Sequence, residues 1–89
     1  MTYFQFVQAV EQQVKAGVKK DHEVRIHTAR KNNGVWRKGL SISESGINVA
    51  PTIYLEEYYQ QFQKGATMEK ITEDILDLYG ELRFQKPWY

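Results

Sequence analysis

The stretch from His22 to Ser43, HEVRIHTARKNNGVWRKGLSIS, decides the fold of this 89-residue chain. In its first part apolar and polar residues alternate with a period of two, which is typical of a half-buried β-strand. Asn32-Asn33-Gly34 follows, and these residue types favour a tight turn. A second run, Val35 to Ser43, carries Leu40 and Ile42 on one face. The stretch therefore predicts a β-hairpin.

The register of this hairpin follows from matching its apolar faces. A two-residue loop at Asn33-Gly34 sets Ile26 against Ser41, which mixes apolar and polar residues on one face. Because a slip of one residue moves every side chain to the opposite face, we predict a three-residue loop instead, with Gly34 as the left-handed residue of a bulge. The predicted pairs are Val24 with Ile42, Ile26 with Leu40, Thr28 with Lys38, Arg30 with Trp36, and Lys31 with Val35.

A third strand is predicted directly after the hairpin. Ser45-Gly46 is a turn signal, and a two-residue turn there pairs Ile42 with Val49. The third strand then covers residues 47–49, and Pro51 ends it. Residues 52–55 either extend this strand or lead into the next helix, and the sequence leaves both interpretations open.

Helices are predicted on both sides of the strands. Thr2 and Gln5 form a capping box ahead of apolar residues at helical spacing, which end between Ala16 and Lys20. A short helix covers residues 56–63, with Gly65 as its stop. Thr67 caps a last helix, which Pro87 closes. The expected core comprises Val10, Val14, Val24, Ile26, Leu40, Ile42, Ile71, Ile75 and Leu78.

The whole chain, residues 1–89, is therefore expected to form a single α+β domain. It is a three-stranded antiparallel meander covered by helices, in the order α-β-β-β-α-α. Twelve basic and eleven acidic residues give a net charge of +1, which excludes binding of nucleic acid by overall charge alone. We expect a cytoplasmic protein with no membrane contact, because the chain has no cysteine and no long apolar run or signal sequence.

Several segments are similar to one known family. They are Lys31–Gly34, Gly39–Ile42, Ser45–Gly65, the opening Met1-Thr2-Tyr3 and the Ile75–Tyr79 run of the last helix. The chain resembles the bacterial domain-of-unknown-function family 5688, found in gut Firmicutes and their mobile elements. The resemblance covers roughly Met1 to Lys86. Because members often continue into a further C-terminal region, it implies that this chain corresponds to their N-terminal region, and it implies no catalytic residue.

The residue types of enzyme sites are present, but their spacing favours structural roles. His22 and His27 share neither a helical nor a strand face, so we expect solvent-exposed histidines rather than a metal site. Ser41, Ser43 and Ser45 lie outside any nucleophile motif. The paired carboxylates at 56–57 and 73–74 fall on helices and suit solvent-exposed faces. We therefore predict no catalytic residue, no metal and no cofactor, and thus no enzyme.

Charge is distributed unevenly along the chain. Residues 15–38 carry eight basic and two acidic residues, a local charge of +6, whereas the remainder carries −5. Much of this positive charge lies at the end of the predicted hairpin, where it suits an acidic partner or a phosphate backbone. The alternative is that these lysines and arginines only protect the sheet from aggregation. The predicted partner-binding residues are Arg30, Lys31, Asn32, Asn33, Trp36, Arg37 and Lys38.

A second candidate surface is aromatic and comprises Tyr54, Tyr58 and Tyr59. Tyr58 and Tyr59 are neighbours on a helix, so they diverge by about 100° and cannot both point into the core. Exposed tyrosines are favoured at protein interfaces. The alternative is a wide apolar face packed between the sheet and the last helix. The acidic last helix is a further possible working surface.

The leading functional hypothesis is a small non-enzymatic binding module that docks a macromolecular partner, in first place a protein with an acidic surface. In the mobile-element context that the resemblance implies, inhibition of a host defence protein is one form of this, by analogy. The alternative hypothesis is direct nucleic-acid binding by the hairpin end, with Trp36 stacking on bases. The sequence leaves the oligomeric state open.

Overall fold

The computed structural model describes the backbone of residues 1–32 and 35–84 and the side chains of residues 1–28 and 37–83. A helix comes first, four strands follow, and two helices end the described part of the chain, which confirms the α+β class. No helix in this part is long and apolar enough to span a bilayer. The elements are α1 (Tyr3–Gly17), β1 (His22–Asn32), β2 (Val35–Glu44), β3 (Ile47–Asn48), β4 (Ile53–Tyr54), α2 (Glu56–Gln63) and α3 (Met68–Phe84).

The register of the hairpin formed by β1 and β2 is confirmed along its length but not at its end. Ile26 lies opposite Leu40, as the matching of apolar faces predicts. Near the turn, however, Asn32 pairs with Val35 and Lys31 pairs with Trp36. The predicted three-residue loop, with Trp36 opposite Arg30, is therefore wrong. Residues 33–34, including the predicted bulge at Gly34, lie outside the described residues.

The extra residue of the hairpin lies inside β1 instead of in the turn. The register shifts between Thr28 and Lys31, where two residues of β1 oppose a single residue of β2, the pattern of a β-bulge. One extra residue of β1 anywhere between Ile26 and the turn leaves Ile26 opposite Leu40. The apolar pattern therefore fixes the register of the core and leaves the place of the bulge undetermined.

The turn into β3 has the predicted length. Glu44 pairs with Ile47 and Ser43 with Asn48, which leaves Ser45 and Gly46 as the two loop residues. Both have positive φ, 53° and 80°, as a type I′ hairpin turn requires. The strand ends at Asn48, one residue earlier than predicted.

The segment that the sequence left open is a fourth strand. Leu40 pairs with Ile53 and Gly39 with Tyr54, so β4 lies on the same edge of β2 as β3. Residues 49–52 separate the two short strands and do not continue the ladder. Pro51 is among them and has no N–H to donate, so the edge is interrupted there.

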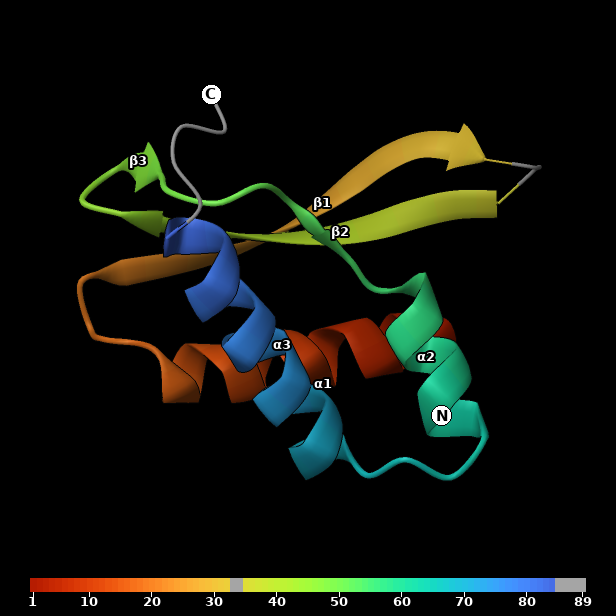
Figure 1. Cartoon of the computed structure of the whole chain (residues 1–89). Helices are drawn as coiled ribbons and strands as arrows, with labels where there is room; N and C mark the ends of the chain where they lie inside the picture. The colour runs from red at the N-terminus through yellow and green to blue at the C-terminus, as the bar shows by residue number, and fades with distance from the viewer. Residues whose placement is uncertain (33–34, 85–89) are drawn as a thin grey trace.

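The three helices cover one side of the sheet, as Figure 1 shows. Seven of the nine predicted core residues are buried, whereas Ile26 and Leu78 are only half-buried. Ile26 lies two residues further along β1 than the buried Val24, toward the turn of the hairpin. Residues missing from the prediction are also buried, namely Phe6, Val7, Ala50, Ile53, Leu55 and Tyr79.

The predicted helix caps are confirmed. The side chain of Thr2 accepts a hydrogen bond from the Gln5 N–H at 3.1 Å, and the Gln5 side chain accepts one from the Thr2 N–H at 3.0 Å. Gly65 follows α2 with a φ of 111°, and Thr67 Oγ1 accepts from the Lys70 N–H at 3.1 Å. The predicted stop at Pro87 lies outside the described residues.

Candidate partner-binding surface

The basic end of the hairpin is formed by the last residues of β1 and the first of β2. The backbones of Arg30, Lys31, Asn32 and Trp36 belong to these strands, while their side chains, and all of Asn33, lie outside the described residues. In Figure 1 the far ends of both strands lie above α2 in the view, at the end of the sheet opposite to β3. Arg37 and Lys38 are the two residues of the predicted site whose side chains the structure describes.

Arg37 is held in place by two contacts from outside the hairpin. Its Nε donates to Glu56 Oε1 at 2.9 Å, and its guanidinium carbon lies 3.7 Å from the centroid of the Tyr54 ring. The Arg37 side chain nevertheless stays 34% exposed. These two contacts restrict the conformations of the Arg37 side chain while leaving part of it open to solvent.

Lys38 is also oriented by its neighbours. Its Nζ donates to Thr28 Oγ1 at 2.7 Å across the hairpin, in agreement with the predicted pairing of the two residues. Its backbone N–H donates to the Tyr3 hydroxyl at 3.3 Å, which ties β2 to the start of α1. The half-buried Lys38 side chain therefore lies across the hairpin toward β1, on the face of the sheet opposite to that of Arg37.

Arg37 also borders a groove of about 390 Å³ between β4, α2 and α3. Tyr54 and Tyr58 of the second candidate surface line the same groove. The structure thus joins one end of the basic site to two of the three tyrosines through the stacking of Arg37 on Tyr54. The remaining wall is formed by Pro51, Thr52, Ile53, Glu56, Glu57, Leu78 and Leu82.

The three tyrosines have different environments. Tyr54 is exposed on the sheet, and Tyr58 is half-buried, with its pKa raised by burial and by the carboxylates of Asp74 and Glu57. Tyr59 packs its ring 5.1 Å from that of Tyr3 and donates its hydroxyl to the Met1 carbonyl at 3.0 Å. Tyr59 therefore fixes α1 against α2, and Tyr54 and Tyr58 are the two that face the groove.

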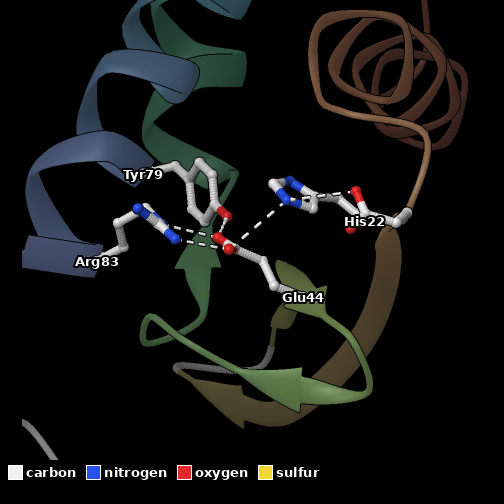
Figure 2. Close-up of polar contacts among 5 residues, drawn as sticks. His22, Glu44, Tyr79 and Arg83 are labelled. Atoms are coloured by element: carbon white, nitrogen blue, oxygen red, sulfur yellow. Dashed lines mark hydrogen bonds and ion pairs between the residues drawn. The ribbon is translucent and has the colours of Figure 1, made fainter.

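A polar cluster joins the end of α3 to the sheet on another part of the molecule (Figure 2). Glu44, the last residue of β2, accepts hydrogen bonds from Arg83 at 2.6 and 2.7 Å and from the Tyr79 hydroxyl. The hydrogen bonds from Arg83 lower the pKa of Glu44 to about 2 against the opposing effect of burial. Burial, followed by the hydrogen bond to Glu44, raises the pKa of Tyr79 to about 12.

His22 belongs to this cluster, so the prediction that it is solvent-exposed is wrong. Its side chain is 12% exposed, and its Nε2 lies 3.6 Å from Glu44 Oε1 and 3.8 Å from Asp21 Oδ1. Its Nδ1 is buried and has no hydrogen-bond partner among the described residues. His22 is the first residue of β1, and Figure 2 shows its ring turned toward Glu44.

His27 lies on the sheet face away from the helices. Its Nε2 is 2.6 Å from Ser41 Oγ. Nucleophilic catalysis by such a pair needs a third group that orients the histidine and donors for the oxyanion. Ser41 is buried, and in the described part of the chain no hydrogen bond orients the second ring nitrogen of His27. We therefore interpret this contact as a structural hydrogen bond between β1 and β2.

Comparison with known proteins identifies the family. The model of a family of unknown function (DUF5688) matches residues 3–88. The chain belongs to the DUF5688 family. The match covers nearly the whole chain and confirms the resemblance seen in the sequence. Neither the curated proteins nor the solved structures include a significant match, so no relative assigns a role to a residue of this DUF5688 domain.

The groove and the Glu44 cluster were not predicted from the sequence. The groove depends on β4, which the sequence left open, and on the half-burial of Leu78, which helical spacing assigned to the core. Glu44 and Arg83 are 39 positions apart, so no local pattern connects them. The sequence signal for this contact is the position of Arg83 in the last turn of a helix. A basic residue there is explained equally well by its interaction with the helix dipole.

Proposed function

We propose that the domain is a non-enzymatic binding module that docks an acidic surface of a protein partner on the basic end of the hairpin. The partner meets Arg30, Lys31, Arg37 and Lys38, together with Asn32, Asn33 and Trp36. A cytoplasmic setting suits this proposal, because the chain lacks cysteine. In a mobile element, such a module would act by covering a site on a host defence protein.

The observation that carries the proposal is the arrangement around Arg37. Its guanidinium is held by Glu56 and Tyr54, and the Arg37 side chain is still one-third exposed. Arginine and tyrosine are enriched among the residues that dominate binding energies at protein interfaces. Because Tyr54 is also exposed, the two side chains form one continuous polar and aromatic surface next to the hairpin end.

Absence of catalysis is part of the proposal and has support from the distribution of polar groups. The most strongly shifted groups, Glu44 and Tyr79, contact each other and Arg83 between α3 and the sheet. Among the described residues, the groove is lined by no histidine, serine or lysine. Its hydroxyl groups, on Thr52, Tyr54 and Tyr58, make no hydrogen bond to Glu56 or Glu57 in this part of the chain, as activation of a nucleophile by a general base would require.

Recovery of the partner from the native host tests this function. The full chain and a variant with Arg30→Ser, Lys31→Ser and Lys38→Ser are used as baits, and the bound material is identified with and without nuclease. Arg37 is left unchanged, because it also supports Glu56 and Tyr54. We expect a protein that the wild type retains after nuclease treatment and that the variant fails to retain.

Two results would redirect the proposal. Recovery that disappears on nuclease treatment would assign the hairpin to nucleic acid, whose binding falls steeply between about 50 and 200 mM salt when several phosphates are neutralised. Equal recovery of one protein by both baits would place the interface elsewhere on the domain.

A further inference from the structure

The outer edge of β4 carries backbone groups that are available for pairing. The N–H of Leu55 donates to the Lys38 carbonyl at 2.9 Å, so the backbone groups of alternate residues, Leu55 and Ile53, face β2. Those of Tyr54 then face away from the sheet, since successive residues of a strand direct their groups to opposite sides. Within residues 1–32 and 35–84, no strand pairs with this edge.

Thr52 continues the same extended alternation. A side chain at Gly39 would meet Thr52 Cγ2 at 2.5 Å and the Tyr54 ring at 3.3 Å, so Thr52 and Tyr54 cover the same residue on the same face. Residues two apart on one face are those of an extended chain. The backbone groups of Thr52 and Tyr54 therefore form a short row of outward donors and acceptors.

This row runs along the groove described above. Pro51 to Tyr54 form one wall of the groove, and Leu78 and Leu82 of α3 form part of the other. A strand that pairs with the edge of β4 directs every second side chain toward the helices. The volume of the groove, about 390 Å³, lies near the lower end of the range of ligand pockets, which is enough for an apolar side chain.

The charges at the rim of the groove indicate which residue of a bound peptide would lie next to the apolar side chain that enters the groove. Arg37 is neutralised by Glu56 at 2.9 Å. Glu57, which follows Glu56 and also lines the groove, is exposed and has no ion pair in the described part of the chain. A lysine or arginine of a ligand fits beside Glu57, whereas an acidic residue there is repelled.

We propose that the edge of β4 accepts an extended peptide segment of another protein, one that places an apolar side chain in the groove and a lysine or arginine beside Glu57. The peptide adds a strand to the sheet, so its main chain supplies affinity and the groove supplies specificity. This site borders the basic hairpin end at Arg37. It does not depend on the function proposed for that end, because its contacts come from the edge of β4, the groove and Glu57.

Selection of random displayed peptides on the full chain tests the inference, followed by affinity measurement with one synthetic peptide of the selected consensus. We expect an apolar residue with lysine or arginine nearby. Glu57→Lys should weaken this peptide by about tenfold, and replacing the peptide's basic residue with glutamate should restore binding to that variant. Glu69→Lys, the matched change in the first turn of α3, should leave the affinity unchanged.

A second pair of variants isolates the main-chain contacts. Thr52→Pro removes an outward N–H at an edge position where proline is tolerated, and should weaken the peptide by about tenfold. Thr52→Ala keeps the N–H and should bind as the wild type does. Because Thr52→Pro could also disturb folding, amide exchange at Tyr54 is measured in the wild type, where the peptide should slow it.

Three results overturn the inference. They are selection of no peptide, an affinity that Glu57→Lys leaves unchanged, and exchange at the Tyr54 amide that the peptide does not slow. Serine substitution of Arg30, Lys31 and Lys38 should not affect the peptide, so failure of the hairpin proposal and failure of this one are distinguishable.

Discussion

Replacing Glu44 with glutamine should weaken the attachment of α3 to the sheet in a pH-dependent manner. The substitution preserves the size of the side chain and removes the charge that Arg83 and Tyr79 contact. The pKa of the Glu44 carboxyl falls from 4.5 to about 2 in the folded chain. This lowering of the pKa corresponds to about 3 kcal/mol of folding free energy as an upper figure.

Solvent screening reduces this figure, because the Glu44 side chain lies at the molecular surface and is 17% exposed. We expect a loss of about 1–2 kcal/mol at neutral pH. A carboxyl whose pKa is lowered by folding stabilises the fold above its unfolded pKa, and the stabilisation disappears as the pH falls toward the folded value. The loss of stability caused by Glu44→Gln should therefore reach its full size above about pH 5 and approach zero near about pH 2.

Urea unfolding followed by circular dichroism, at neutral pH and at several acidic pH values, measures this difference between the wild type and Glu44→Gln. Glu57→Gln is the control, since Glu57 is exposed and has no ion pair in the described residues. It should change the stability by less than about 0.5 kcal/mol. A loss for Glu44→Gln that is equal at neutral pH and at pH near 2, or absent at both, would refute the assignment of this stabilisation to the carboxylate charge.

Two further predictions concern packing and the alkaline range. Gly39→Ala should destabilise the fold by about 1–3 kcal/mol in urea unfolding, because the added Cβ would lie 2.5 Å from Thr52 Cγ2. Gly80→Ala, in α3, should stabilise it by about 0.5–1 kcal/mol, because its Cβ would meet nothing within 4 Å. Stability changes of the same sign in both variants would contradict the close approach at Gly39. Tyr79→Phe should remove a stabilisation that is present below about pH 10 and is lost as the pH rises through about 12. Thermal unfolding of the wild type and the variant from neutral to alkaline pH measures it. If the stability of both proteins declined in parallel with pH, the prediction would be contradicted.

Local signals in the sequence account for most of the elements. The capping box at Thr2, the glycine stop at Gly65 and the cap at Thr67 each mark a helix end correctly, since each satisfies backbone groups of its own helix. The register of β1 against β2 is equally local. It follows from one alternating face, and Ile26 opposite Leu40 is the consequence.

Features that depend on distant contacts were not predictable. Whether residues 53–54 form a strand depends on Leu40, more than ten positions away, offering a ladder partner. The bulge in β1 leaves the apolar pairing unchanged, so the pattern contained no information about its place. His22 reads as exposed in sequence because the residues that cover it, Glu44 and α3, are far along the chain.

The candidate surface was predictable in composition and not in arrangement. The concentration of positive charge near Arg37 is evident from the sequence, as are the tyrosines. That Arg37 stacks on Tyr54 and pairs with Glu56 is a tertiary fact. It changes the interpretation of Arg37 from one of several basic residues at the hairpin end to a fixed contact between the hairpin and the groove.

The most direct test of the hairpin as the partner-binding surface is the affinity of the purified native partner for the domain at low and at moderate salt. The account predicts that serine at positions 30, 31 and 38 weakens binding by at least about tenfold, or about 1.4 kcal/mol, with more of the loss at low salt. It also predicts that the variant unfolds at the same urea concentration as the wild type. Equal affinities of the two proteins at both salt concentrations would contradict it.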